Sequence, residues 1–226
     1  MTGSTERPLA GMHPHAGRLM RRRDPAAAPM KTTQTMKRRM TSAIVAALLA
    51  SAAQAACAAE HSGVQFDDSV QLAGTELQLN GLGLRSLFIL KAYVAGLYVP
   101  ERSSHAADLL AQTGPRRLAL KMLVEMSPER MTKAFRDGLT QNLNESQMTA
   151  LRPQVDQLAE SMRAMGPARK GDVVDIDLID GQIQVLLNGQ PRGEPIAGEA
   201  FFNAILQIFI GPRPVDRELK RGLLGG

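Results

Sequence analysis

The amino-acid sequence predicts an α+β domain, in which a large antiparallel sheet carries a layer of helices on one face. Three observations lead to this prediction. Segments that alternate between polar and apolar residues come first, two segments with apolar residues at helical spacing follow, and an alternating pair precedes a last apolar helical segment. Strands and helices grouped in this way are typical of α+β folds, and an antiparallel sheet commonly keeps one face on a core.

The first 55 residues are expected to lie outside this domain. Residues 36–55 begin with MKRRM, continue with the apolar run TSAIVAALLA and end in small residues, which is the pattern of a secretory signal peptide. The apolar run is too short for a transmembrane helix, which needs about 20 residues. Residues 1–35 show no periodicity and are interpreted as a leader upstream of the true start. Residues 56–226 then form one domain without a transmembrane segment, periplasmic or secreted.

The net charge of +5 comes from this N-terminal part. Nine of the 27 lysines and arginines and two of the 22 acidic residues lie in residues 1–55, which leaves 18 basic and 20 acidic residues, a net charge of −2. A domain with that charge is not expected to bind nucleic acid.

Cysteine and histidine are scarce. Cys57 is the only cysteine, so the chain forms no internal disulfide and no thiolate cluster, and its lipidation stays open because Gln54 replaces the usual aliphatic residue. Only His61 and His105 follow the expected signal peptide. No metal site and no cofactor are therefore expected.

The first elements are read in order. Residues 63–81 contain short alternating pieces separated by Gly, Asp and Asn, which predict opening strands. The segment NGLGLRSLFILKAYVAGLYVP, residues 80–100, is interpreted as one long strand, with Gly81 and Gly83 marking a turn or bulge at its start. SSHAADLLAQTG predicts a short helix with a serine N-cap, and RRLALKMLVEM alternates like a further strand.

Helices and a hairpin follow. The sequence SPE at residues 127–129 combines a cap, a first-turn proline and an early acid, which predicts a helix start. Asn144 caps a second helical segment, which Pro153 kinks or restarts. Asp180-Gly181 and Asn188-Gly189 supply the turn residues of a hairpin meander. The segments EAFFNAILQIFIG and PVDRELKRGLLGG predict two C-terminal helices.

Three acids of the hairpin resemble part of a calcium loop. Asp175, Asp177 and Asp180 precede Gly181, but the D-x-[DN]-x-[DN]-G spacing of an EF-hand is not met. We interpret them as acids that face the solvent.

The candidate functional residues lie on the expected long strand. Arg85, Lys91 and Tyr93 fall on odd positions together with several aliphatic residues, and alternate residues of a strand share a face. Such a face is either solvated, with the charged heads in water, or the wall of a small-ligand cleft. In a cleft, a guanidinium and a phenol would bind a carboxylate or a phenolate. Alternation alone leaves both interpretations open.

Two motifs carry a family resemblance. The segment of residues 80–100 and the C-terminal FFNAILQIFIGPRPVDRELKRGLLG together resemble the chalcone isomerase-like proteins, specifically their secreted bacterial branch. The resemblance covers residues 64–225. It implies an open-faced β-sandwich, with a large antiparallel sheet, helices on one face and a cleft between sheet and helices.

The resemblance points away from catalysis. Plant chalcone isomerases use an arginine, a strand threonine, a tyrosine and an asparagine. Here the threonine aligns with Tyr93, the tyrosine and asparagine fall near Ser127 and Ala134, and Arg85 is the counterpart of the arginine. Groups that would stabilise an enolate are missing, so flavanone formation is not expected. Non-catalytic members are similar to fatty-acid-binding proteins, in which an arginine and a tyrosine hold the carboxylate.

The sequence therefore favours a secreted, non-enzymatic protein that binds a fatty acid or a similar apolar acid. Arg85 and Tyr93 are the expected head-group ligands, with Lys91 assisting. Two alternatives stay open: an isomerase or lyase acting on an enone-like substrate, and an interaction module whose sheet face docks another envelope protein.

Overall fold

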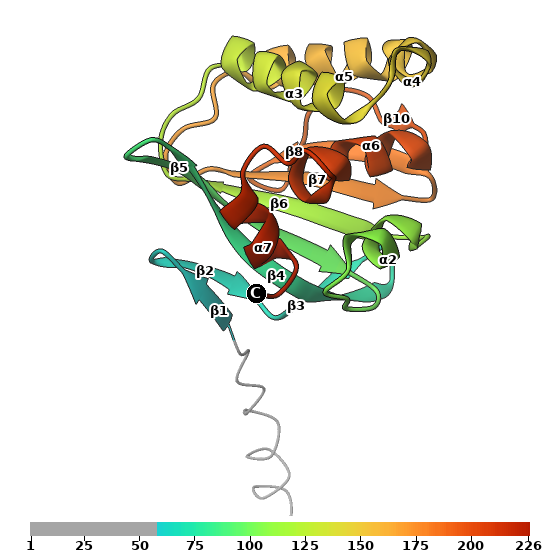
Figure 1. The fold of residues 1–226 in the computed structure, drawn as a ribbon. Coiled ribbons are helices and arrows are strands. Elements are labelled where there is room, and N and C mark those ends of the chain that lie inside the picture. Colours follow the sequence, from blue (N-terminus) through green and yellow to red (C-terminus); the bar gives the residue numbers. More distant parts are fainter. Residues whose placement is uncertain (1–57) are drawn as a thin grey trace, which may run out of the picture. The chain divides into compact units, whose positions relative to one another are not determined.

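The computed structural model describes residues 58–226 (Figure 1). The expected leader, the expected signal peptide and Cys57 lie outside the described residues. Residues 58–226 contain every strand and helix named below and bury two apolar cores among themselves. None of the described helices is both long enough and apolar enough to cross a membrane.

An eight-stranded antiparallel sheet forms the body of the domain. Its strands are β3 (Ser69–Leu72), β4 (Thr75–Leu87), β5 (Leu90–Val99), β6 (Arg116–Met122), β7 (Val173–Ile179), β8 (Gln182–Leu187), β9 (Gln190–Pro191) and β10 (Ile196–Ala197). Their order is β10-β8-β7-β6-β5-β4-β3, and β9 pairs with β8. A separate hairpin consists of β1 (Ala58–His61) and β2 (Val64–Asp67).

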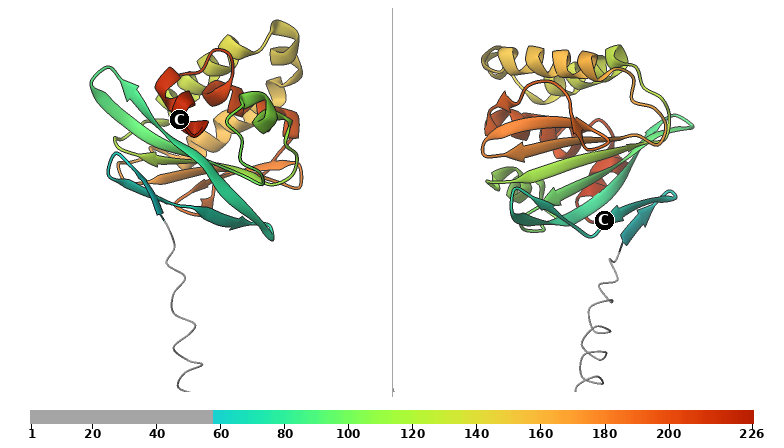
Figure 2. Two further views of the ribbon diagram at one scale, coloured as in Figure 1. Left: turned by 60° about the horizontal axis from the view of Figure 1, so that its bottom comes forward. Right: turned by 180° about the vertical axis from the view of Figure 1, so that it is seen from behind.

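Helices gather on one face of this sheet (Figures 1 and 2). They are α2 (Ala106–Ala111), α3 (Pro128–Asn142), α4 (Glu145–Ala150), α5 (Arg152–Met165), α6 (Glu199–Ile210) and α7 (Arg217–Leu223). Helix α6 contacts α2, α3, α7 and strand β8, and α3 also contacts α5. The α+β fold predicted from the sequence, an antiparallel sheet with a layer of helices on one face, is confirmed.

The single long strand predicted for residues 80–100 is wrong. The chain turns at Phe88 and Ile89, so β4 and β5 form a hairpin. The turn escapes sequence reading because neither residue is a usual turn former. Arg85 and Tyr93 lie on different strands as directly opposed residues, not on one strand.

Two of the predicted helix caps are confirmed and one is wrong. The Ser127 hydroxyl accepts a hydrogen bond from the Arg130 backbone N–H, and Asn144 forms a capping box with Gln147. Helix α2 instead begins after His105, whose side chain makes no capping bond.

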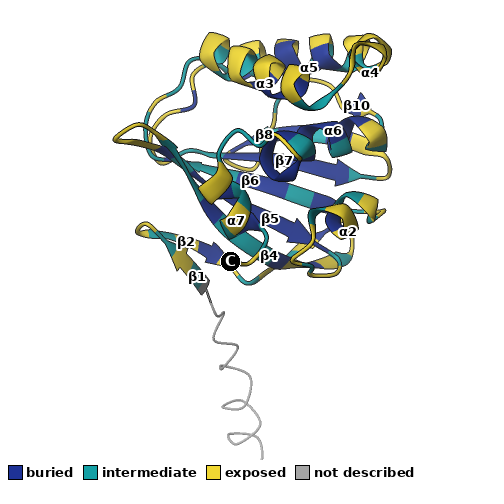
Figure 3. Ribbon diagram, viewed as in Figure 1, coloured by how far each residue is buried: buried dark blue, intermediate teal, exposed yellow. Residues whose placement is uncertain are grey.

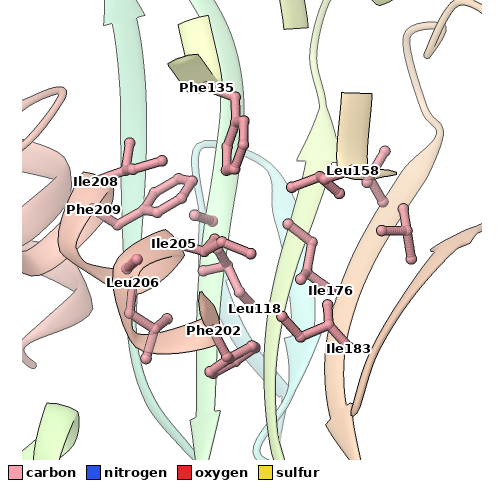
Figure 4. Packing of buried hydrophobic residues seen from close by; sticks show 14 of the residues in the cluster. Leu118, Phe135, Leu158, Ile176, Ile183, Phe202, Ile205, Leu206, Ile208 and Phe209 are labelled. Atoms are coloured by element: carbon pink, nitrogen blue, oxygen red, sulfur yellow. The ribbon is translucent and has the colours of Figure 1, made fainter. Parts of the chain in front are cut away.

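From Val94 to Val99 both faces of β5 are buried. Ala95, Leu97 and Val99 are 0% exposed and belong to the core beneath the helices. Val94 and Tyr98 belong to a second core, which includes residues of the β1–β2 hairpin. The helix-side core is widest around α6, where residues such as Ile205 and Phe209 face the strands (Figure 4). The helix-facing side of β5 is therefore neither solvated nor free to dock a partner.

The prediction that Asp175 and Asp177 face the solvent is wrong. Asp177 is 2% exposed and Asp175 is 8% exposed, while Asp180 lies exposed in the β7–β8 turn. Arg117 lies opposite Asp177 on β6 and donates two hydrogen bonds of 2.6 Å to its carboxylate. A charge-assisted bidentate pair compensates the burial of this acid.

Two glycines of β4 permit a close approach of helix α7. A bulge interrupts the register between Leu79 and Gly81, as the sequence suggested. A Cβ atom at Gly81 would lie 2.2 Å from the Gly222 carbonyl oxygen, and one at Gly83 would lie 2.3 Å from the Leu219 oxygen. We call this backbone contact between β4 and α7 the glycine seam. The N-cap of the same helix, Asp216, lies beside Arg85.

Candidate functional site

An apolar cavity of about 90 Å³ lies between the sheet and the helices. Strands β5 to β8 provide its floor and helices α3, α5 and α6 its roof. It is lined by Tyr93, Leu120, Met122, Met126, Met131, Ala134, Phe135, Leu158, Met162, Met165, Val174, Ile176, Val185, Ile205, Ile208, Phe209 and Val215. The only polar group on these side chains is the Tyr93 hydroxyl. Figure 4 shows Phe135, Phe209 and Ile176 among the side chains of this region.

The cavity is too small to hold a long acyl chain without movement of its wall. An engineered cavity of about 150 Å³ holds a molecule of the size of benzene. Five of the lining residues are methionines, at positions 122, 126, 131, 162 and 165. Methionine is unbranched and fills irregular space in several rotamers, so these side chains can rearrange around a ligand at low cost. The cavity is suited to an apolar guest of variable shape.

Tyr93 lies at the edge of the cavity and is half-buried. Burial raises the pKa of its phenol well above the ordinary value, and Asp216 adds to the rise, although the nearby Arg85 opposes it. The phenol therefore remains protonated and can donate a hydrogen bond. Among residues 58–226 no partner takes this bond.

Arg85 faces Tyr93 across the β4–β5 ladder, on the side of α7. Its Nη1 donates to the Ser86 carbonyl at 2.9 Å and to Asp216 Oδ2 at 3.2 Å. Neither its Nε nor its Nη2 is bonded within the described part of the chain. The Asp216 carboxylate caps α7 by accepting hydrogen bonds from the Glu218 and Leu219 backbone N–H groups, and it also accepts one from the Ser86 N–H of β4. Arg85 itself is not part of the cavity wall.

The structure brings two of the three predicted site residues together. Arg85 and Tyr93 are neighbours, whereas Lys91 is exposed near the β4–β5 turn and lies opposite Ser86. The resemblance places two catalytic residues of the plant enzymes near Ser127 and Ala134. Ala134 lies in the cavity wall, and Ser127 is the N-cap of α3.

Sequence reading missed Arg116, which is 0% exposed. Its guanidinium donates to Glu199 Oε1 and Asn203 Oδ1, both at 2.8 Å, and lies 5.1 Å from the centre of the Phe202 ring. Burial lowers the pKa of Arg116, and Glu199 opposes that change. This arginine joins β6 to α6 far from Tyr93 and is structural. No sequence signal marked it, since Arg116 and Arg117 form an ordinary basic pair.

Among residues 58–226 no group of three His, Cys, Asp or Glu side chains could hold a metal ion. The site that remains is an apolar chamber with one phenol in its wall and one guanidinium beside that phenol. Such a site can bind an apolar molecule that carries one anionic or hydrogen-bond-accepting end.

Comparisons with known proteins bear on the family and the fold. The pattern of the family described as chalcone isomerase-like matches residues 58–225. The fold is similar to the crystal structure of an Arabidopsis thaliana fatty-acid binding protein, AtFAP1, with a TM-score of 0.59 and 15% sequence identity. That likeness covers 74% of this chain and 96% of the plant chain. No curated protein matches the sequence.

Proposed function

We propose that this chain, which belongs to the chalcone isomerase-like family, binds a fatty acid or a similar apolar acid and does not catalyse a reaction on it. The acyl chain occupies the methionine-lined cavity. Tyr93 donates a hydrogen bond to the carboxylate, and Arg85 provides the positive charge. Lys91, exposed nearby, adds attraction without contact.

One observation carries the proposal: the Tyr93 phenol is the only polar group in an apolar wall, and a guanidinium lies directly opposite it in register. A carboxylate at that place would meet a neutral donor and a cation with unused N–H groups. Because such charge-assisted hydrogen bonds are stronger than neutral ones, they can hold the head group while the chain supplies apolar burial.

The isomerase alternative finds less support. Stabilising an enolate requires several preorganised donors around the reacting oxygen. The cavity wall offers only the Tyr93 hydroxyl, because the Ala134 side chain has no donor and Ser127 is not part of the wall.

A titration with cis-parinaric acid, a fluorescent 18-carbon fatty acid, and with its methyl ester tests the proposal. We expect Arg85→Met to weaken binding of the acid by at least about tenfold and to leave the ester unaffected, because the lost interaction is charge-assisted. Tyr93→Phe should weaken binding by about fivefold through one lost hydrogen bond. Val174→Phe, which enlarges a buried side chain of the cavity wall, should weaken both ligands.

Arg136→Met is the matched control, since Arg136 forms an exposed ion pair with Asp156 on the outer side of α3. It should bind the acid like the wild type. The proposal is wrong if the wild type binds neither ligand, or if Arg85→Met binds the acid as tightly as the wild type does.

We also propose that the protein is exported, as in a secreted bacterial branch of the family, with residues 36–55 as its signal peptide. N-terminal sequencing of the protein recovered from the periplasm should give a start near residue 56. Recovery of the uncleaved chain from the cytoplasm would contradict export.

A further inference from the structure

The β4–β5 hairpin ends in four consecutive exposed apolar residues. Phe88 and Ile89 are as exposed as in a free peptide, at 104% and 102%, and the flanking Leu87 and Leu90 are 42% and 49% exposed. We call these four residues the apolar tip; Figure 3 shows this hairpin end as exposed. They are the only large hydrophobic residues classed as exposed among residues 58–226.

The turn at the tip also differs in its residue types from the other two-residue hairpin turns of the described chain. The other two-residue hairpin turns are Ser62-Gly63, Ala73-Gly74, Asp180-Gly181 and Asn188-Gly189, each with glycine second. The β4–β5 turn has Phe88 at a φ of +55° followed by Ile89. A bulky side chain at positive φ is disfavoured, and a turn of this form prefers glycine there. A conflict with local preference that is kept at an exposed site indicates a use for the side chains.

The tip lies at the same end of β5 as Tyr93, which is part of the cavity wall. Tyr93 is four residues along β5 from Ile89, or roughly 13 Å at the rise of a strand. The partly exposed residues Tyr93, Met126 and Val215 belong to the cavity wall. The Leu123 N–H bonds to the Ala92 carbonyl, so the loop that leads to α3 is fastened beside the start of β5.

Positive charge lies at the same end. Lys91 is exposed beside the tip, and the exposed Arg169 and Lys170 lie on a loop whose Gly171 bonds to Met122 beside that strand. Figures 1 and 2 show this loop at the same end of the molecule as the hairpin tip. The acids at this end include Glu125, Asp172 and Asp216. Asp172 accepts hydrogen bonds from Asn188 and the Arg169 backbone N–H, and Asp216 pairs with Arg85 beside Ser86.

We propose that the apolar tip inserts into the interface of a phospholipid bilayer and brings the Tyr93 end of the cavity to the membrane surface. A protruding tip suits a bilayer better than a protein partner. Phe88 contributes on the order of 200 Å² and the whole tip stays below the roughly 800 Å² that each side of a stable protein interface buries. Lysine and arginine beside an apolar element attract anionic lipid head groups.

Flotation with vesicles tests the proposal without any fatty acid, so the outcome does not depend on whether the protein binds one. The proposed function only gives a reason for the membrane contact. The protein is residues 58–226, which excludes the apolar run of the expected signal peptide. We expect binding to phosphatidylcholine vesicles that contain a third of phosphatidylglycerol, and weaker binding without phosphatidylglycerol. Replacing Lys91 and Lys170 by serine should weaken binding about fivefold per charge on the anionic vesicles only.

The decisive variant is Phe88→Gly with Ile89→Asn, which gives the turn favoured residues. It should lose vesicle binding by about tenfold or more and should unfold at the same or a higher temperature than the wild type. Asp180→Gly with Gly181→Asn introduces the same two residues at the opposite end of the sheet. This control should bind vesicles like the wild type.

A fluorescence reporter locates the tip directly, because the chain has no tryptophan. Ile89→Trp should show a blue shift with vesicles and quenching by brominated lipids, whereas His105→Trp, beyond the far end of β5, should show neither. Absence of wild-type binding, or unchanged binding by the decisive variant, overturns the proposal. A dimer that the decisive variant dissociates, without any vesicle binding, would identify the tip as a self-association surface instead.

Discussion

The two faces of the sheet carry the same three residue types in different states. On the helix side, Tyr93 and Arg85 are opposed across β4 and β5, and Arg85 contacts Asp216. On the other side, Tyr98 and Arg117 are opposed across β5 and β6, and Arg117 contacts Asp177.

The second set is closed. Tyr98 is 3% exposed, and its hydroxyl donates to the Asp67 carbonyl at 2.9 Å, while Arg117 makes two short bonds to Asp177. The first set is open, since Arg85 reaches Asp216 through one bond and the Tyr93 phenol has no partner among the described residues. The same side-chain types therefore stabilise the sheet in one set and keep unused hydrogen-bond donors in the other. The difference lies in how many of their donors already have a partner.

Removing each arginine should separate the two sets most strongly. Arg117→Ala leaves the nearly buried Asp177 without its partner, and we expect a loss of about 3 kcal/mol in the free energy of unfolding. Arg85→Ala should lose about 1 kcal/mol or less, because Asp216 is partly exposed and keeps its backbone donors. Chemical denaturation of both variants measures the contrast. Equal losses would show that the two sets are not different in kind.

Replacing the tyrosines should lower the free energy of unfolding less than replacing the arginines does, and again more at Tyr98 than at Tyr93. Tyr98→Phe removes the donor to the Asp67 carbonyl and should lower the free energy of unfolding by about 1 kcal/mol. Tyr93→Phe should leave stability unchanged, since its hydroxyl has no partner within residues 58–226. A comparable loss in Tyr93→Phe would reveal a structural bond for this phenol.

The smallest expected effect concerns Asp175, next to the closed set. Burial raises the pKa of this carboxyl above its ordinary value, an effect that Arg117 and Lys121 oppose and Asp177 strengthens. Ionised Asp175 therefore lowers the stability of the folded state at neutral pH. This destabilisation decreases as the pH falls through the raised pKa toward about 4, where the carboxyl is protonated. Asp175→Asn should gain melting temperature over the wild type at pH 7 and lose that gain at pH 4.

Asp172 provides a control of opposite sign. Hydrogen bonds from Asn188 and from the Arg169 backbone lower the pKa of its carboxyl. Its ionised form stabilises the fold above the ordinary pKa, and that stabilisation disappears as the pH falls through the lowered value. Asp172→Asn should therefore melt below the wild type at pH 7, with a difference that shrinks in acid. The same sign for both variants would contradict this account.

Residue patterns anticipated much of the fold because most of its local signals are ordinary. The cap at Ser127, the capping box at Asn144 and the glycine turns of the β7–β8–β9 meander all lie where local chemistry prefers them. The β4–β5 turn was missed because Phe88 and Ile89 carry no turn preference. The sequence analysis placed Arg85 and Tyr93 on the same face because both occupy odd positions of one expected strand. They do share a face, but the reason is that they are opposed in the β4–β5 hairpin.

What sequence patterns could not give is the burial of single polar residues. Asp177 was predicted to face the solvent because no residue of its own strand indicates an ion-pair partner. Its partner is Arg117, 60 positions away in the sequence. Arg116 likewise finds Glu199 and Asn203 on the distant helix α6. The cavity itself arises from helices and strands that meet only in the folded chain, although the methionines that line it are visible in the composition.

The position of Asp216 sets the order in which the site can be completed during synthesis. Val215 in the cavity wall, Asp216 beside Arg85 and the α7 half of the glycine seam all come from the last dozen residues of the chain. A nascent chain can therefore form most of its sheet before these residues emerge, but it cannot close this end of the molecule. A chain that stopped before Asp216 would keep every strand of the sheet but would lack the carboxylate that contacts Arg85.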